Sequence, residues 1–472
     1  MAIKKLASKL RMVSIVAFLL IVFGSSAFCE DCTKVIPSRV GNIDNAVKID
    51  NTWTGAAVGF DAVERNRLIY IGYYDSLRRL SIAQYSLDSF KLCVTHLGST
   101  FGGWDGHNNI VMAFDTRGRL HIAGNMHDSR LVYGRSFKAN SISDVEMQGM
   151  VGVDEDSVTY PNFAVTPDGS LSFLYRNGTS GDGGWYVNVF NGLEWRRAVD
   201  GKIFAATSRG RTTSAYPSPF VIGPDGFANI SIVWRRKLDV KTNYAISFVK
   251  TRDFIHWFDH NGNALKLPIG PEDDDVIENT GEERGLLNSQ RVGASADGQP
   301  IVAYTRYGSD GKNAIILARP NGKIWKKSII ASSKRVATIR GGGSLPQAPR
   351  FQVPSSLGSG IGKIQISFPD EPAKVIYFDE TTLSPVATPD LGRQKHDKGI
   401  LISSPNNLVD GRKIEIEVRS YSTEQPVGSS GRIVYFAQRA DRDRPRSCTT
   451  SEPTACNPPS TPLVFIPNLS HQ

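Results

Sequence analysis

The chain has 472 residues, 21% of them charged and 40% hydrophobic, and its 44 glycines and 25 prolines predict many turns. The formal net charge is +9, which suits an anionic ligand without identifying one. The sequence has no run of Lys or Arg and no basic helix, which argues against nucleic acid as a partner.

Residues 1–29 have the three parts of a secretory signal peptide, and we exclude them from the fold. Four basic residues between Lys4 and Arg11 precede the apolar run Val13–Phe23, whose eleven residues are too few to span a bilayer comfortably. Ser25–Ala27 and Ala27–Cys29 both offer small residues for cleavage. We therefore expect a secreted or periplasmic protein that leaves the membrane after cleavage and acts as a monomer.

The five cysteines fit an oxidising compartment. Cys448 and Cys456 close a short Ser/Thr/Pro loop, and we expect them to form a disulfide. Cys32 and Cys93 are the next predicted pair, which leaves Cys29 either removed or free, although spacing alone does not determine connectivity. The absence of a CxxC motif argues against a redox function.

The stretch from Trp104 to His127 predicts a β-hairpin with polar residues at its open end. Apolar runs over 110–114 and 120–123 flank the turn 115–118, so His107 and His127 come together at the mouth. We interpret this histidine pair as part of a functional site, whereas His121 lies inside the second strand and is expected to be structural. A zinc pair is the alternative, but no nearby HxH or CxxC supplies further ligands.

One pattern recurs along the chain: a turn containing Asp or Gly, followed by a strand in which apolar and polar residues alternate. Strand starts in the seven copies are spaced by 50 to 72 residues. The copies are Arg67–Tyr74, Arg119–Ala123, Pro167–Arg176, Pro224–Trp234, Ala296–Tyr304, Gly362–Phe368 and Asp410–Val418.

A spacing of about fifty residues is typical of one four-stranded propeller blade with its loops. No amphipathic helix separates the copies, which argues against alternating strand–helix units. The sequence therefore predicts an all-β, seven-bladed β-propeller over residues 30–445, followed by a Pro/Ser/Thr-rich surface tail over 446–472. Insertions are expected at 271–283 and 340–344. A β-sandwich with a second domain is the alternative.

Polar clusters follow the repeated strands and predict a ligand site where blades converge. Gly124–His127, Tyr175–Arg176, Trp234–Arg236 and Thr305–Arg306 stand at these ends. Unpaired buried arginine is costly, so several arginines and two histidines around one channel mouth favour an anionic ligand. The alternative for each arginine is an ion pair between blades. Aromatic residues could stack on sugar rings or belong to the core: Trp104, Tyr160, Trp185, Tyr216 and Trp234.

Several segments of the sequence resemble the BNR-repeat (bacterial neuraminidase repeat) family, and within it the seven-bladed propeller polysaccharide lyases that cleave ulvan. The resemblance covers roughly residues 50–310 best, and it rests on the opening hairpin together with VTYPN (158–162), YRNGxS (175–180), GWYVN (184–188), AYPS (215–218), VWRR (233–236) and TNY (242–244). The chain departs from sialidases, because the SxDxGxTW box survives at best as Thr251–Trp257. It also has Asn243–Tyr244 where relatives often have Asn-His.

The resemblance implies a catalytic centre of His107, His127, Tyr160 and Arg176. We expect a further set of residues to bind the substrate: Trp104, Asn108, Asn125, Tyr216, Trp234, Arg235 and Asn243.

These residue types suit β-elimination of a uronate-containing anionic polysaccharide, sulfated or not. Arg176 would neutralise the uronate carboxylate and stabilise the enolate-like transition state. His107 or Tyr160 would serve as base, Tyr160 as acid, and His127 would orient the substrate or act as a second acid or base. This reaction requires no cofactor. The sequence leaves open whether the protein also binds a structural metal ion.

Two other functions remain as alternatives. A glycoside hydrolase on the same scaffold needs two carboxylates, for which Asp105, Asp128 and Asp182 are the candidates. A non-catalytic carbohydrate-binding propeller needs neither a base nor an acid.

Overall fold

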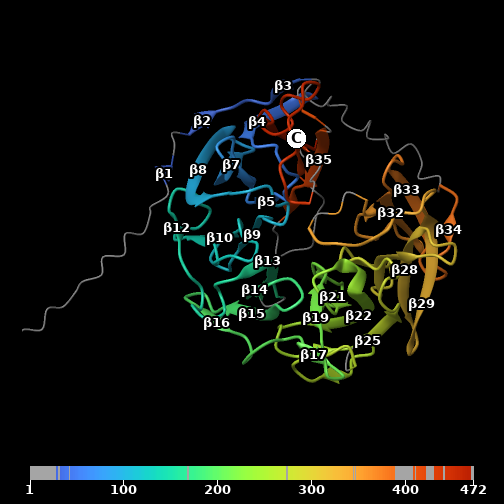
Figure 1. The fold of residues 1–472 in the computed structure, drawn as a ribbon. Helices are drawn as coiled ribbons and strands as arrows, with labels where there is room; N and C mark the ends of the chain where they lie inside the picture. The colour runs from blue at the N-terminus through green and yellow to red at the C-terminus, as the bar shows by residue number, and fades with distance from the viewer. Residues whose placement is uncertain are drawn as a thin grey trace, which may run out of the picture.

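The computed structural model describes residues 28–29, 32–41, 43–166, 169–272, 275–343, 345, 347–388, 408–409, 411–420, 430–438 and 442–468. Almost all of the expected signal peptide lies outside these residues. The described chain is all-β, and its one helix is the 3₁₀ turn η1 (Val240–Thr242). No helix in these ranges is long and apolar enough to cross a bilayer. The sheets follow one another around a ring, as a β-propeller (Figure 1).

Six sheets are blades built from consecutive stretches of chain, with antiparallel main strands. Blade 1 contains β5 (Asp61–Arg65), β6 (Leu68–Tyr74), β7 (Arg79–Ser86) and β8 (Lys91–Thr100). Beside it lie β1 (Phe28–Cys29), β2 (Thr33–Lys34) and the parallel β36 (Arg419–Ser420). Blade 2 contains β9 (Val111–Phe114), β10 (Leu120–Ala123), β11 (Tyr133–Ser136) and β12 (Val145–Met147). Blade 3 contains β13 (Val158–Val165), β14 (Leu171–Asn177), β15 (Gly184–Phe190) and β16 (Trp195–Arg197).

The other three blades follow the same order. Blade 4 contains β19 (Ser214–Pro217), β20 (Val221–Ile222), β21 (Ala228–Arg235), β22 (Asn243–Thr251), β23 (Trp257–Phe258), β24 (Ala264–Leu265) and β25 (Asp275–Asn279). The hairpin β17 (Thr207–Ser208) and β18 (Arg211–Thr212) precedes it. Blade 5 contains β26 (Arg291–Ala294), β27 (Pro300–Tyr307), β28 (Asn313–Asn321) and β29 (Ile324–Ser332). Blade 6 contains β30 (Arg350–Phe351), β31 (Ser355–Ser356), β32 (Ile361–Ser367), β33 (Lys374–Asp379) and β34 (Pro385–Val386).

A further sheet joins the two ends of the chain, and we call it the closing sheet. Its order is β3-β4-β38-β37-β35. The strands are β3 (Ser38–Val40), β4 (Ile43–Thr52), β38 (Thr461–Pro467), β37 (Gly431–Gln438) and β35 (Gly411–Glu417). Residues 461–467 therefore lie in a sheet, whereas the sequence prediction assigned them to a surface tail. Leu463 and Phe465 are fully buried there, because their apolar side chains need a core.

The prediction of seven equivalent blades is corrected to six blades in the described residues, together with the closing sheet. The first six sequence copies are the second strands β6, β10, β14, β21, β27 and β32. The seventh copy is β35, an edge strand that pairs with β37 in a sheet whose strands come from both ends of the chain. Local alternation does not encode a strand's place in its sheet, so the pattern located strands correctly but overcounted equivalent units.

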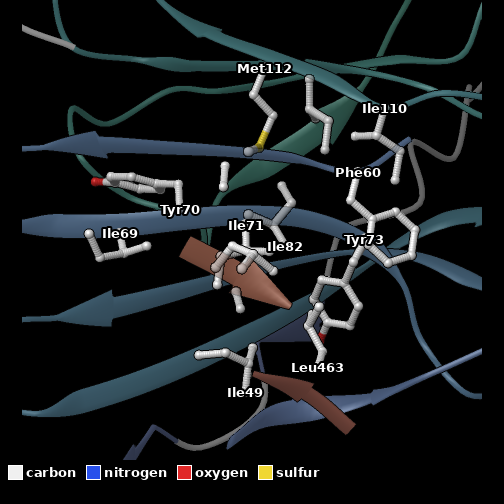
Figure 2. Packing of buried hydrophobic residues seen from close by; sticks show 14 of the residues in the cluster. Ile49, Phe60, Ile69, Tyr70, Ile71, Tyr73, Ile82, Ile110, Met112 and Leu463 are labelled. Carbon is white, nitrogen blue, oxygen red and sulfur yellow. The ribbon is translucent and has the colours of Figure 1, made fainter. Parts of the chain in front are cut away.

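The core around blade 1 shows how the closing sheet is held. Tyr73 and Ile71 of β6, Met112 of β9, Ile49 of β4 and Leu463 of β38 belong to one buried cluster (Figure 2). Strands from opposite ends of the chain therefore share one hydrophobic core.

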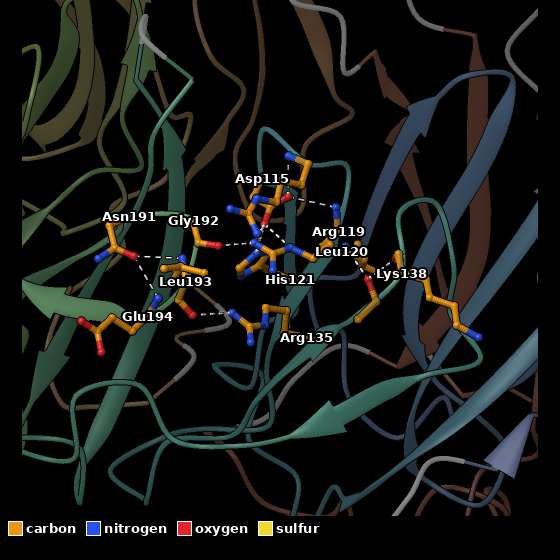
Figure 3. Close-up of polar contacts among 12 residues, drawn as sticks. Asp115, Arg119, Leu120, His121, Arg135, Lys138, Asn191, Gly192, Leu193 and Glu194 are labelled. Carbon is orange, nitrogen blue, oxygen red and sulfur yellow. Dashed lines mark hydrogen bonds and ion pairs between the residues drawn. The ribbon is translucent and has the colours of Figure 1, made fainter.

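His121 belongs to a polar network inside blade 2, as expected for a structural residue. Asp115 accepts a hydrogen bond from the Nε atom of Arg119 at 2.7 Å (Figure 3). The Tyr133 hydroxyl contacts the His121 Nδ1 atom at 2.8 Å. Arg119 also donates to the Gly192 carbonyl of blade 3. The network fixes the β9–β10 hairpin turn and ties blade 2 to blade 3.

Both predicted disulfides are present. Cys32 is bonded to Cys93 and clamps β2 against β8, while Cys448 is bonded to Cys456 in the C-terminal segment. Two disulfides fit an oxidising compartment, outside the cytosol.

First strands of neighbouring blades surround a central channel. Asn109, Tyr160, Tyr216 and Arg291 line a cavity of about 350 Å³ between these strands. The repeated sequence copies are the second strands, which pair with these first strands in each sheet.

Candidate active site

The β9–β10 hairpin brings His107 and His127 together, as the sequence predicts, and a carboxylate lies between them. Asp105 binds the Nδ1 atom of His107 at 2.6 Å through one oxygen and that of His127 through the other. The imidazole rings stack with centroids 4.5 Å apart. Among the described residues, no further group bonds either Nε2 atom. If each Nδ1 carries its proton toward Asp105, each Nε2 is left as an acceptor.

Charge and burial act in opposite directions on this group. Burial lowers the pKa of His107, but the hydrogen bond and charge of Asp105 outweigh it and raise that pKa above its ordinary value. Burial also acts on Asp105, whose pKa nevertheless falls well below its usual range because both histidines bind it. Asp105 is therefore an anion that holds two imidazoles in fixed orientation.

Tyr160 stands at a bulge in β13, where its backbone has a φ of 58°. A left-handed conformation is uncommon for a tyrosine and is maintained only by surrounding structure. The ring stacks parallel to Trp185 at 6.0 Å and lies edge-on to His107 at 6.1 Å. Burial raises the pKa of Tyr160 and the charge of Arg176 opposes this, so the phenol keeps its proton at neutral pH.

Arg176, near the end of β14, has its guanidinium 5.1 Å from the centre of the Tyr160 ring. The side chain is only 1% exposed, and its Nη2 atom donates to Thr159 at 3.1 Å. Its Nε and Nη1 atoms have no hydrogen-bond partner among the described residues. Gly183 makes room for this side chain, because a Cβ atom there would lie 2.5 Å from Cδ of Arg176.

Arginines near the ends of corresponding strands in blades 4 and 5 are paired instead. Arg235 is bound by Asn243, Tyr216 and Asn288, and Arg306 forms an ion pair with Glu278 at 3.1 Å. The alternative of an ion pair between strands therefore holds for Arg306. Arg176 differs, because two of its buried donors are left for a ligand.

A pocket of about 550 Å³ opens beside these groups, and we call it the catalytic pocket. It is lined by His127, Asp128, Arg176, Thr179, Ser180, Gly181, Asp182 and Leu238. Tyr160 lies behind Arg176 and lines the central channel. The structure thus brings together all four predicted catalytic residues, because His127 contacts His107, His107 contacts Tyr160, and Tyr160 contacts Arg176.

The predicted substrate-binding residues are placed less uniformly. Asn108 is buried, and Asn125 donates to Ser99. Trp104 is partly exposed and packs edge-on against Trp53.

Tyr216, Arg235 and Asn243 form one buried hydrogen-bond network beside Ser180. They therefore hold Ser180 in the pocket wall and do not line the pocket themselves. The structure corrects the prediction that Trp234 binds substrate. Its side chain is fully buried in a hydrophobic cluster and cannot stack on a sugar.

Two acidic groups were not among the predicted catalytic residues. Asp105 stands two positions before His107, so a search for a carboxylate near the histidine pair would have found it as their partner. Asp443 comes from the C-terminal segment, and its carboxylate lies 3.8 Å from Nδ1 of His107. No sequence signal links Asp443 to a hairpin more than three hundred residues away.

The cluster could hold a metal ion on spacing alone. One ligand atom each from Asp105, His107 and His127 lies within 4.8 Å of the others. A structural zinc site needs four protein ligands, and in the part of the chain that the structure describes only these three form such a group. Their mutual hydrogen bonds account for the arrangement without a metal.

Comparison with known proteins places the chain in a family. The profile of the BNR repeat-containing family matches residues 68–333, more than half of the sequence. The chain belongs to this family. No curated protein matches it.

Solved structures of two polysaccharide lyases resemble this BNR-repeat protein. A polysaccharide lyase of family PL25, an ulvan lyase bound to GlcA(1-4)Rha3S units, has a TM-score of 0.53 and 16% identity, covering 72% of this chain and 85% of its own. The polysaccharide lyase Uly1 has a TM-score of 0.53 and 13% identity, covering 91% and 94%. At these identities the similarity establishes the propeller fold alone.

Proposed function

We propose that this BNR-repeat protein is a polysaccharide lyase that cleaves a uronate-containing anionic polysaccharide by β-elimination. The observation that carries the proposal is Arg176, a buried cation with two unpartnered donors at a pocket that also contains His127. Buried guanidinium donors without acceptors are costly, and the oxygens of a uronate carboxylate would supply acceptors for them.

The carboxylate must be neutralised before the neighbouring C5 proton becomes acidic enough to remove. Arg176 is fixed by Thr159 and by packing on Tyr160, so it needs little reorganisation when negative charge develops. The same charge stabilises the enolate-like transition state.

The base takes the C5 proton, and the electron pair forms the C4–C5 double bond as the C4–O bond breaks. His107 suits the role of base because Asp105 binds its Nδ1 atom and leaves Nε2 as the acceptor. His127, held by the same carboxylate, would orient the sugar or act as a second acid or base.

The leaving oxygen must receive a proton. Tyr160 suits this role because burial raises the pKa of its phenol and keeps it protonated. The structure favours Tyr160 as acid over Tyr160 as base for this reason, and no cofactor enters the reaction.

A panel of anionic polysaccharides tests the proposal. The purified protein should release products with the ultraviolet absorbance of a conjugated 4,5-unsaturated uronate from at least one glucuronate- or iduronate-containing polymer, ulvan included. A neutral polymer serves as the control substrate. Absence of the chromophore across the panel, with intact binding, would instead favour a carbohydrate-binding propeller.

Hydrolysis is the second candidate, and one observation favours it: Asp128 and Asp182 both line the catalytic pocket. Asp105 is less suited, because both histidines occupy it. A hydrolase would shorten the polymer without producing the chromophore.

The proposal includes an export route and an assembly state. Removal of the signal peptide at 1–29 would release a monomeric, secreted or periplasmic enzyme. Its propeller would extend over 30–445, with the C-terminal segment contributing β38.

A further inference from the structure

A second pocket, which we call the outer groove, lies over blade 4. Its volume is about 260 Å³, and its lining includes Arg209, Arg211, Arg236, Tyr244, Glu272 and Glu282. None of these residues takes part in the chemistry described above.

Two of the three arginines in the outer groove are neutralised locally. Arg209 lies 3.4 Å from Glu272, and Arg211 lies 3.2 Å from Glu282. Arg236 has no carboxylate within ion-pair distance among the described residues. Arg236 is therefore the groove's uncompensated cation.

The planar guanidinium of Arg236 is held in place by stacking on an aromatic ring. Its guanidinium stacks 4.0 Å above the centre of the Tyr244 ring, and Tyr244 is fixed by a hydrogen bond to Thr213 at 3.0 Å. The Nη1 atom makes long contacts of 3.4 Å with the carbonyls of Ser208 and Thr212. Among the described residues, Nε and Nη2 make no hydrogen bond, so they can bind an oxyanion in the fork geometry typical of arginine.

The outer groove and the catalytic pocket are neighbours. Arg236 lines the groove and Leu238 lines the catalytic pocket. Two residues along a chain span at most about 7 Å between Cα atoms. Exposed Lys237 stands between them, so the track from one pocket to the other is cationic.

We propose that the outer groove is a second anion-binding site, in which Arg236 holds a sulfate or carboxylate group on a sugar of the polysaccharide some way along from the sugar bound at Arg176. This rests on the proposed function for the identity of the polymer, and it adds a requirement for two anionic groups on one chain. A neutral glycan cannot meet that requirement.

Binding measured without turnover tests the groove. Ulvan is titrated by calorimetry into Tyr160→Phe and into Tyr160→Phe combined with Arg236→Gln, which removes the charge but keeps a planar donor. The second protein should bind about tenfold more weakly, as expected for loss of a hydrogen bond to a charged group. Arg67→Ala, an exposed arginine on blade 1, is the matched control and should leave affinity unchanged.

Desulfated ulvan identifies the anionic group. An Arg236→Gln effect that disappears on the desulfated polymer assigns a sulfate to the groove, and one that persists assigns a carboxylate. Circular dichroism and a thermal melt establish folding, and Arg236→Lys, which keeps the charge without the fork, replaces the glutamine variant if that variant melts early. It should show an intermediate loss.

The result separates the two proposals. Equal affinities of Tyr160→Phe and of the Tyr160→Phe, Arg236→Gln double variant for ulvan would overturn the proposed anion site in the outer groove. No binding by either variant would overturn it too, whether or not the wild type releases unsaturated product. Weaker binding by the Arg236 variant together with an absence of unsaturated product would leave the groove standing and overturn the lyase.

Discussion

Arg176, Arg235 and Arg306 occupy corresponding strand ends, yet only Arg176 has buried donors without partners. The sequence alone predicted all three near the site, because it shows where each arginine stands along its strand but not which side chains it bonds. The hairpin pattern predicted that the two histidines meet, and the resemblance to the BNR-repeat lyases added Tyr160 and Arg176, which lie beside them in the structure. Asp443 could not be predicted, because its contact with His107 depends on the path of the C-terminal segment.

Replacing Arg176 should reduce turnover far more than stability. Arg176→Lys keeps the charge but loses the planar fork, so activity should fall strongly. Arg176→Ala should lose about 2–4 kcal/mol of transition-state stabilisation, as for loss of an oxyanion donor. Initial rates of unsaturated product measure this. Arg306→Ala, which breaks an ion pair with Glu278, is the control and should keep its rate. Normal turnover by folded Arg176→Ala would refute the catalytic role.

Tyr160→Phe should abolish elimination while leaving substrate affinity largely intact, because it deletes only the proton donor. A rate loss on the order of a hundredfold or more is expected for an acid catalyst. Rates and calorimetric affinities are compared with those of Tyr186→Phe, a tyrosine that packs against Tyr175 instead. A large loss of affinity in Tyr160→Phe would point to a binding role.

The pH dependence should report the Asp105–His107 pair. Asp105 raises the pKa of His107, so the base is neutral only above the ordinary histidine value of about 6.5, and kcat/KM should rise with pH through that region. Asp105→Asn removes the raising charge, so the acid limb should move to lower pH while the maximal rate falls. A limb that stays in place would exclude His107 as the titrating base.

At the scale of elements, the β9–β10 hairpin is stabilised by the polar network around Asp115. Burial lowers the pKa of His121. The hydrogen bond that its ring shares with the Asp115 carboxylate raises the pKa but does not outweigh burial, so the folded state favours the neutral imidazole. The unfolded chain takes up that proton below about pH 6.5, and stability should therefore fall as the pH drops below this value.

Asp115→Asn should destabilise the protein by about 3 kcal/mol, because it leaves the buried Arg119 without its charged partner. Denaturant unfolding at neutral pH measures the change. Asp44→Asn, whose carboxylate is 85% exposed, is the matched control and should change stability little. Equal midpoints for the two variants would show that the network contributes nothing.

At the scale of the whole molecule, the sequence predicted the all-β propeller because alternation and turn residues recur at blade spacing. It did not predict the closing sheet, since pairing of β4 with β38 depends on strands separated by about four hundred residues. The tail beyond residue 446 looked like surface from its Pro, Ser and Thr content. Its last strand nevertheless completes the core, because Leu463 and Phe465, two positions apart on one face of β38, belong to the buried cluster.

Leu463→Ala tests the closing sheet. Removing a fully buried leucine should cost about 2–5 kcal/mol and lower the melting temperature of the whole propeller. Leu193→Ala, at a side chain that is 68% exposed, is the control. A separate early transition in the Leu463 variant, with the rest of the protein melting as wild type, would show that the sheet is not part of the common core.

The central claim is that the polymer is cleaved by elimination and not by water. Digestion in water enriched in heavy oxygen, followed by mass spectrometry of the products, tests it most directly. Elimination incorporates no oxygen from solvent at the broken bond, so both product ends should keep natural oxygen and the new non-reducing end should be an unsaturated uronate. Incorporation of one heavy oxygen per cleavage, with saturated ends, would contradict the lyase and establish a hydrolase.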